Sequence, residues 1–228
     1  MFFNEVVLKV EEAIKKLRTK FLESPYTFYT ESDIHCYLYH LLYQKKVFKE
    51  PAKVLVRRKP ILTIRLHKEY PTLGKFYKAP RKRVLIPHNK KEPYITIEGK
   101  TLQPSRGSYD MAIIDPDEKQ DFKWQKTSIA IELALNEIHP SLWHLQNDYT
   151  KIAFDVDKVE RGYILFFIRK ADLSDYLIRK RLPQIRANLR TDYEQSLNPN
   201  VRILYLESPK TEEESEIHLP SEWNIETD

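Results

Sequence analysis

Two acidic residues stand in strand-like stretches whose other members are mostly apolar or small. Asp110 lies in the run 109–115 and Glu132 in the run 128–136, where Ile and Leu alternate with small residues and this one acid. That alternation is typical of a strand that buries an aliphatic face. Asp110 shares its expected face with Ala112 and Ile114, so if the two runs pair, Asp110 and Glu132 meet at one end of a sheet.

Two carboxylates at that distance repel each other unless a cation lies between them. Mg2+ requires few protein ligands because it retains much of its water. The sequence therefore predicts a metal site on Asp110 and Glu132, with Mg2+ or Mn2+ as the cofactor.

Other site chemistries have no clear motif in this sequence. The seven histidines include no H-E-x-x-H pattern, and the single cysteine, Cys36, excludes an internal disulfide and an all-cysteine zinc site. Four glycines leave no phosphate-binding loop, and no G-x-S-x-G elbow is present, although composition does not exclude a Ser-His-Asp triad. We expect Cys36 to pack within a helix, since free cysteine prefers burial.

Two helices are expected before the strands that carry the acids. Residues 5–22 repeat apolar side chains every three or four positions, and a second helix opens at residues 30–33, which resemble a capping box with Asp33 in place of Glu or Gln. Ile34, Leu38, Leu41 and Leu42 form its expected core stripe. Glu31 lies in its first turn, where an acid is favoured by the helix dipole, so it is either a site residue or simply a good helix start.

The strands and helices that follow predict a mixed sheet. Residues 61–67 alternate as a strand with Leu62, Ile64 and Leu66 on one face, and the Asp110 and Glu132 strands are expected to be antiparallel neighbours. The expected later elements are a helix from His139 with a Leu142, Leu145, Ile152 and Val156 stripe, a strand at 163–168 covered on both faces, a helix at 173–189 bent or interrupted at Pro183, and a strand at 201–206.

One α/β domain accounts for these elements. We expect a central mixed β-sheet flanked by helices over residues 1–206, with a basic strand and loop insertion at about 68–106 and short strands near 83–86 and 94–98. Residues 207–228 are acidic and poor in aliphatic side chains, which predicts a loosely held C-terminal tail.

Positive charge is concentrated in one segment. Residues 57–106 contain fourteen Lys or Arg against three Glu, a local balance of +11, so with a total of +5 the remainder carries −6. This separation favours binding to a polyanion, with Tyr70, Phe76, Tyr77 and Tyr94 placed to rest on sugars or bases, although a solvated basic loop is the alternative. The candidate nucleic-acid contacts are Arg57, Arg58, Lys78, Arg81, Lys82, Arg83, Lys90, Lys91 and Arg106.

Apolar runs in this chain are short. The longest, residues 163–168, has the length of a strand, and no leader-like segment or membrane span is visible. Together with one cysteine, this predicts a cytoplasmic protein without a membrane partner.

The order of these elements resembles the PD-(D/E)XK nuclease superfamily, which has the restriction-endonuclease-like fold. The resemblance spans about residues 30–169 and depends on Glu31, Asp110, Glu132 and the D-x-x-K pattern of Asp148 and Lys151. It implies a Mg2+-dependent phosphodiesterase, an endonuclease or exonuclease acting on DNA. Asp110, Glu132 and Glu31 would be the metal ligands, with Glu31 as an auxiliary acid.

One departure from the family pattern concerns the lysine that normally follows two residues after the motif Glu. Here that position is Ala134, on the same face as Glu132. Either a lysine from elsewhere enters the site, with Lys151 as the best candidate and Lys126 and Lys123 as weaker ones, or the protein binds metal and nucleic acid without cutting. In the family this lysine positions the attacking water and offsets charge on the phosphate.

Three functions therefore remain open at this point. The first is a metal-dependent nuclease with Glu31, Asp110, Glu132 and Lys151 as catalytic residues. The second is a catalytically inactive nuclease-fold protein that binds nucleic acid or a partner protein. The third is a basic protein that docks on an acidic partner. DNA is the expected partner, RNA is an alternative that the sequence leaves open, and a homodimer is compatible with the composition.

Overall fold

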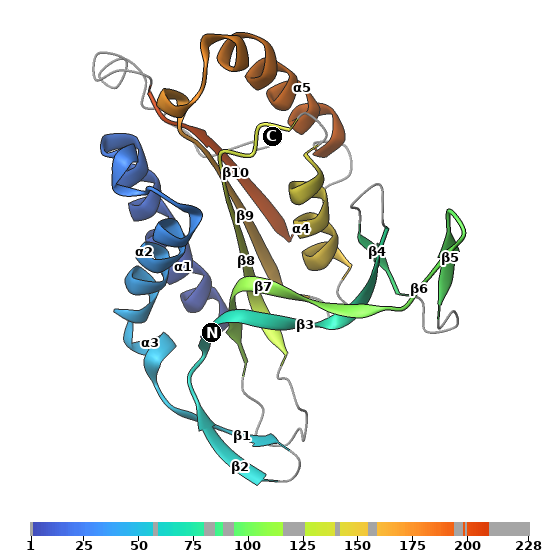
Figure 1. Cartoon of the computed structure of the whole chain (residues 1–228). Helices are drawn as coiled ribbons and strands as arrows, with labels where there is room; N and C mark the ends of the chain where they lie inside the picture. Colours follow the sequence, from blue (N-terminus) through green and yellow to red (C-terminus); the bar gives the residue numbers. More distant parts are fainter. Residues whose placement is uncertain are drawn as a thin grey trace.

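The computed structural model describes residues 2–56, 59–79, 85–88, 94–115, 126–139, 142–154, 159–193, 198 and 200–209. Over these residues the chain forms a six-stranded mixed sheet in the order β10-β9-β8-β7-β3-β4, with helices on both faces (Figure 1). The predicted fold class, a central mixed sheet flanked by helices, is confirmed. The helices are α1 (Phe2–Glu23), α2 (Glu31–Tyr43), α3 (Lys46–Lys49), α4 (Trp143–Ala153) and α5 (Leu182–Tyr193).

Six strands build the main sheet and four more form two small hairpins. The main strands are β3 (Leu66–Lys78), β4 (Leu85–Pro87), β7 (Ser105–Ile114), β8 (Thr127–Leu135), β9 (Arg161–Ile168) and β10 (Val201–Glu207). The hairpins pair β1 (Ala52–Val56) with β2 (Lys59–Thr63), and β5 (Ile95–Ile97) with β6 (Lys100–Leu102).

The strands divide into an antiparallel half and a parallel half. β3, β7 and β8 follow one another as an antiparallel meander, which confirms that the Asp110 and Glu132 strands are antiparallel neighbours. β9 is parallel to β8 and β10 is parallel to β9, so α4 and α5 lie in the crossover connections. Parallel neighbours require such crossovers, and these place α4 beside β8, where Glu132 lies.

Alternation along β7 and β8 separates two hydrophobic cores. Met111 and Ile131 belong to the first core, which α1 and α2 cover, whereas Ala112 and Ala130 belong to the second, which α4 and α5 cover. β9 contributes buried side chains to both cores, as expected for a strand covered on both faces.

A complete capping box fixes the start of α2. The Thr30 amide donates to Asp33 Oδ2 at 2.6 Å, and the Asp33 amide donates to Thr30 Oγ1 at 3.3 Å. These bonds satisfy amide groups that the helix itself leaves unpaired. Ile34, Leu38 and Leu42 are buried as predicted. The same register directs Glu31 and His35, one turn apart, toward the sheet.

The strand predicted at residues 61–67 is wrong. The run 61–67 is not one strand, because β2 ends at Thr63 and belongs to a separate hairpin in which Leu62 is 69% exposed. β3 begins at the next residue but two, Leu66. Between the two strands, the Arg65 side chain pairs with Asp115, and the Arg65 carbonyl accepts a hydrogen bond from the Ile114 amide. The chain thus leaves the hairpin and enters the main sheet at that point.

The predicted insertion at 68–106 begins too early. β3 pairs with β7 over most of its length and is part of the main sheet, although the pairing shifts register between Pro71 and Lys75. Tyr70, Phe76 and Tyr77 are consequently buried and do not present rings to a nucleic acid, whereas Tyr94 is exposed. The short strands expected near 83–86 and 94–98 correspond to β4 and β5.

Three later boundaries also differ from expectation. α4 begins at Trp143 and not at His139, after Leu142 adopts a left-handed backbone with φ 45°. The expected helix at 173–189 consists of a π-helical segment, η3 (Leu177–Arg181), followed by α5, in which Pro183 occupies the first turn. β10 extends to Glu207, so the predicted tail at 207–228 begins within the last strand, and residues 210–228 lie outside the described residues.

The expectation that Cys36 packs within its helix is wrong, because Cys36 is exposed.

Close contact between α4 and β9 predicts a severe effect of a single methyl group. A Cβ added at Gly162 would lie 2.3 Å from Ile152 Cγ2 of α4. We expect Gly162→Ala to lower the free energy of unfolding by about 1–3 kcal/mol, because α4 must move away from the sheet. Denaturant unfolding measures this change.

The matched control is the double variant Gly162→Ala with Ile152→Ala, which removes the clashing atoms. Its loss of stability should be smaller than the sum of the two single losses. Additive losses, or a Gly162→Ala protein as stable as the wild type, would show that α4 does not lie this close to β9.

Candidate functional site

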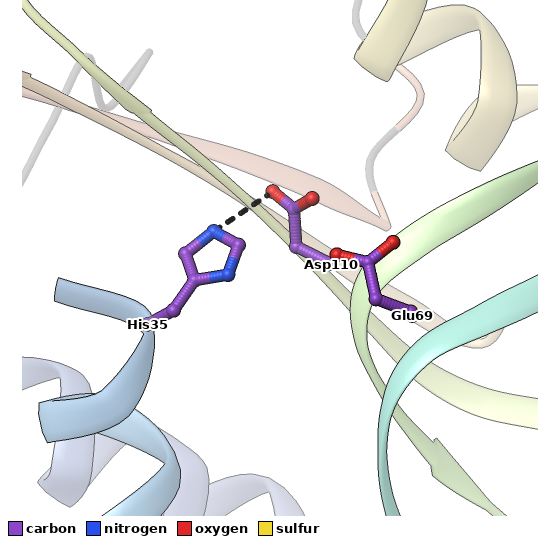
Figure 2. Close-up of side chains that lie close together, drawn as sticks. All are labelled: His35, Glu69 and Asp110. Atoms are coloured by element: carbon purple, nitrogen blue, oxygen red, sulfur yellow. Dashed lines mark ion pairs between the residues drawn. The ribbon is translucent and has the colours of Figure 1, made fainter. Parts of the chain in front are cut away.

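Acidic side chains from four elements converge between α2 and α4. Asp110 comes from β7, Glu132 from β8, Glu69 from β3 and Glu31 from the first turn of α2. Figure 2 shows that His35 of α2 points at Asp110 and that Glu69 lies beside it. The site therefore lies on the antiparallel strands β3, β7 and β8, with α2 on one face of the sheet and α4 on the other.

Asp110 is held in place by a backbone hydrogen bond. The amide of Leu133 donates to Asp110 Oδ2 at 2.7 Å, two residues beyond the last pairing of β7 and β8 at Met111 and Ile131. Burial favours the neutral acid, but His35, the Leu133 amide and the charge of Lys151 together hold the pKa of Asp110 below its usual range. Asp110 is therefore an ionised carboxylate with a fixed orientation.

The regular alternation expected along β7 is broken at Asp110. Tyr109 packs in the second core and Met111 in the first, although they are two residues apart on the same strand. As a result Asp110 contacts His35 on the α2 side, whereas Glu132 contacts Lys151 on the α4 side. The expectation that Asp110 simply shares the face of Ala112 is therefore incorrect. The two carboxylates are still near enough for the charge of Asp110 to raise the pKa of Glu132.

Lys151 is buried between two carboxylates. Its Nζ lies 2.5 Å from Glu132 Oε1 and 2.9 Å from Asp148 Oδ1, and it donates to the Ser108 carbonyl at 3.1 Å. The side chain of Lys151 is 13% exposed and that of Glu132 only 1% exposed. Burial alone would lower the pKa of Lys151, but attraction to both carboxylates raises it above its ordinary value, so the ammonium stays charged.

Both carboxylates beside Lys151 are hard to ionise. Burial, followed by the charge of Asp148, raises the pKa of Glu132 well above its usual value, and Lys151 opposes this. Burial likewise raises the pKa of Asp148 to about 6, again opposed by Lys151. Burial thus favours the neutral form of both acids, and the single ammonium of Lys151 favours their ionised form.

Strand β7 provides the space through which Lys151 passes. A Cβ at Gly107 would lie 3.2 Å from Lys151 Cδ, so a glycine here lets the lysine stem lie against the strand. The hydroxyl of Tyr109 donates to the Lys151 carbonyl at 3.3 Å. Contacts from three neighbouring β7 residues, Gly107, Ser108 and Tyr109, therefore set the position of the ammonium.

Glu31 and His35 lie one helical turn apart on the inner face of α2. His35 Nε2 is 4.0 Å from Glu31 Oε1 and 3.5 Å from Asp110 Oδ2. Burial, together with the charge of Asp110, raises the pKa of Glu31. His35 thus links Glu31 to Asp110, and Lys151 contacts Glu132. The charge of Asp110 acts on Glu132 and the charge of Lys151 acts on Asp110, which connects these two groups electrostatically.

The other predicted basic residues fall into three groups. Lys126 pairs with Glu160 at 2.6 Å beside the first residue of β8, away from Glu132. Lys78 and Arg106 are exposed on β3 and β7, and Arg106 donates to the Thr72 carbonyl at 2.6 Å. The remaining candidates lie outside the described residues, namely Lys123, Arg57, Arg58, Arg81, Lys82, Arg83, Lys90 and Lys91.

Two residues near Asp110 were missed by sequence reasoning. His35 belongs to no metal motif, yet it lies four residues after Glu31, which is the spacing that puts two side chains on one helix face. Glu69 carries no such signal, because its carboxylate is directed by a left-handed backbone (φ 52°) within β3.

Comparisons with protein-family models, with curated proteins and with solved structures found no match to this chain. Among the described residues, no helix is long and apolar enough to cross a membrane.

Glu137, which follows β8, predicts a pH dependence of stability. Burial, with repulsion from Asp148 and Glu31, raises its pKa to about 7, although the His144 amide donates to its carboxylate. Between pH 4.5 and 7 the folded protein therefore retains a proton that the unfolded chain has released, and the free energy of unfolding falls as pH rises through that window. Glu137→Gln should make this fall smaller.

Thermal unfolding at several pH values between 5 and 8 tests this prediction. Glu23→Gln on the exposed surface of α1 is the matched control and should show the wild-type slope. Identical slopes for Glu137→Gln and wild type would contradict the raised pKa.

Proposed function

We propose that this protein is a metal-dependent nuclease of the restriction-endonuclease-like fold that hydrolyses phosphodiester bonds in DNA. The observation that carries the proposal is the position of Lys151, whose ammonium lies 2.5 Å from Glu132 although the residue belongs to a different element. Ala134, on the same side of β8 as Glu132, leaves the usual lysine position without a cation. Lys151 takes over that function from α4.

The chain topology supports the same proposal. α2, the antiparallel strands β3, β7 and β8, then α4 and the parallel strand β9 occur in the order on which the resemblance to PD-(D/E)XK nucleases was based. Asp110 and Glu132 lie on adjacent strands in the middle of this order. Topology alone supports the fold and not the activity, so the site residues carry the functional argument.

The donor set suits a divalent cation. Four acids, Glu31, Asp110, Glu132 and Asp148, stand against the single buried ammonium of Lys151 and the imidazole of His35. Asp110 and Glu132 would hold Mg2+ or Mn2+, which when bound supplies Lewis-acid stabilisation of the phosphoryl oxygens. Asp110 is already ionised and oriented for this by the Leu133 amide.

Lys151 would act on charge that develops on the phosphate during hydrolysis. Its ammonium is fixed by Glu132, Asp148 and the Ser108 carbonyl before any substrate arrives, so no reorganisation is required at the moment of reaction. From this position it would hold the attacking water and offset negative charge in the transition state. Glu31 would act as the auxiliary acid at the edge of the site.

DNA would approach over the strands that carry the site. Lys78 and Arg106 are exposed on β3 and β7, within the segment that carries the local charge of +11. A positive surface there would bind phosphates independently of sequence and with strong dependence on salt. RNA remains the alternative substrate, and cleavage assays on both polymers distinguish them.

Cleavage of plasmid and linear DNA with Mg2+ or Mn2+ tests the proposal. We expect Lys151→Ala to lower the cleavage rate by about 10²–10³-fold, because a positioned charge contributes mainly to the transition state. DNA affinity should stay within about threefold, since one phosphate contact contributes little to binding. Asp110→Asn should abolish cleavage as well.

Lys126→Ala is the matched control, because it removes a lysine that pairs with Glu160 away from the site, and it should cleave at the wild-type rate. Lys151→Met retains the apolar stem and separates loss of charge from loss of packing, with circular dichroism as the check on folding. A wild-type protein that cleaves neither DNA nor RNA, or a folded Lys151→Ala protein that cleaves normally, would overturn the proposal.

A further inference from the structure

One buried imidazole near Asp110 has a nitrogen without a hydrogen-bond partner. His35 is 5% exposed, and its Nε2 makes no hydrogen bond among the described residues. Figure 2 shows this nitrogen directed at the Asp110 carboxylate, 3.5 Å from Oδ2. The nitrogen is thus at ion-pair distance from Asp110 but makes no hydrogen bond, and an ion placed between the nitrogen and the carboxylate would satisfy both.

Glu69 brings a third donor to the same place. It lies on β3 beside Asp110 (Figure 2). Its carboxylate accepts a hydrogen bond from the Ser108 hydroxyl at 3.4 Å. Its backbone is left-handed, with φ 52°, which is rare for a residue with a long side chain within a strand. The exposed carboxylate can therefore adjust while its backbone directs it toward Asp110.

The spacing of these three donors matches a shared ion. One ligand atom from each of His35, Glu69 and Asp110 lies within 4.8 Å of the other two. Two atoms about 2.1 Å from one ion are roughly 3.0 Å apart in octahedral and roughly 3.4 Å apart in tetrahedral coordination. The 3.5 Å between His35 and Asp110 is close to these separations, and Glu69 needs only a side-chain movement.

We infer that His35, Glu69 and Asp110 form a cation site that binds Mn2+, Fe2+, Co2+ or Zn2+ in preference to Mg2+. Imidazole nitrogen is a good ligand for these transition ions, whereas Mg2+ favours oxygen and sheds its water reluctantly. Asp110 belongs also to the proposed nuclease site. The use of this ion in cleavage thus rests on the proposed function, whereas the binding of the ion does not.

A purely structural arrangement would account for the same three residues differently. Protonated His35 would form a buried ion pair with Asp110, and Glu69 would be an exposed acid held by Ser108. That arrangement needs no ion and predicts no preference between metals. Metal affinities measured without DNA separate the two arrangements.

Mn2+ binding to the intact protein, followed by electron paramagnetic resonance of the free ion, is the test. We expect wild type to bind Mn2+ at least about tenfold more tightly than Mg2+, with Mg2+ measured by competition. His35→Gln should weaken Mn2+ binding by about 10–100-fold and leave Mg2+ affinity within about twofold, since only the transition ion uses the nitrogen. Glu69→Gln should weaken both ions.

Two matched controls exist in the chain. His40→Gln changes an exposed histidine of the same helix, and Glu98→Gln changes another glutamate with a left-handed backbone, φ 50°. Both should bind Mn2+ as wild type does. Because Glu69 is exposed, Glu69→Gln reports on the site even if His35→Gln fails to fold, which thermal unfolding detects.

Equal affinities of wild type for Mn2+ and Mg2+, no binding of either ion, or unchanged Mn2+ binding by both folded variants would overturn the inference. These outcomes are independent of cleavage. Tight, His35-dependent Mn2+ binding without any cleavage would uphold the cation site and reject the nuclease activity. Cleavage together with equal affinities for Mn2+ and Mg2+ would uphold the nuclease activity and reject the cation site.

Discussion

The buried contact of Lys151 with Glu132 and Asp148 is the interaction on which the arrangement of the site depends. An ammonium of this kind is stable only if its charge is matched, and removing one partner of a buried pair typically costs about 3–5 kcal/mol. The fold satisfies this requirement by bringing α4 against the sheet, with Gly162 beneath Ile152 and Gly107 beneath the lysine stem. Packing and electrostatics are therefore coupled in this part of the protein.

Asp110 divides the site into two parts with different chemistry. On the α4 side, Glu132 and Asp148 surround a permanent positive charge, whereas on the α2 side His35 and Glu69 surround none. The break in alternation at Asp110 directs its carboxylate between these parts. An ion on one side and an ammonium on the other would together neutralise the acids and leave a polarised site for a phosphate.

The sequence could predict the features that depend on local periodicity. Period-two alternation was enough to pair β7 with β8, and the capping box was enough to place Glu31 at the start of α2. It could not predict Glu69 or the aim of Asp110, because a positive φ and an interrupted alternation depend on tertiary contacts. β3 was misassigned for a related reason, since its basic and proline residues conceal the alternate positions that pack in the core.

The central claim is that a lysine from α4 replaces the lysine missing at position 134. The most direct measurement is metal-dependent nicking of supercoiled DNA by the double variant Lys151→Ala with Ala134→Lys, compared with Lys151→Ala alone. Position 134 lies two residues from Glu132 on the same side of β8, so a lysine there reaches the same carboxylate. The account predicts that the double variant regains nicking that the single variant has lost. A folded double variant that binds DNA like wild type but does not nick it would contradict the account.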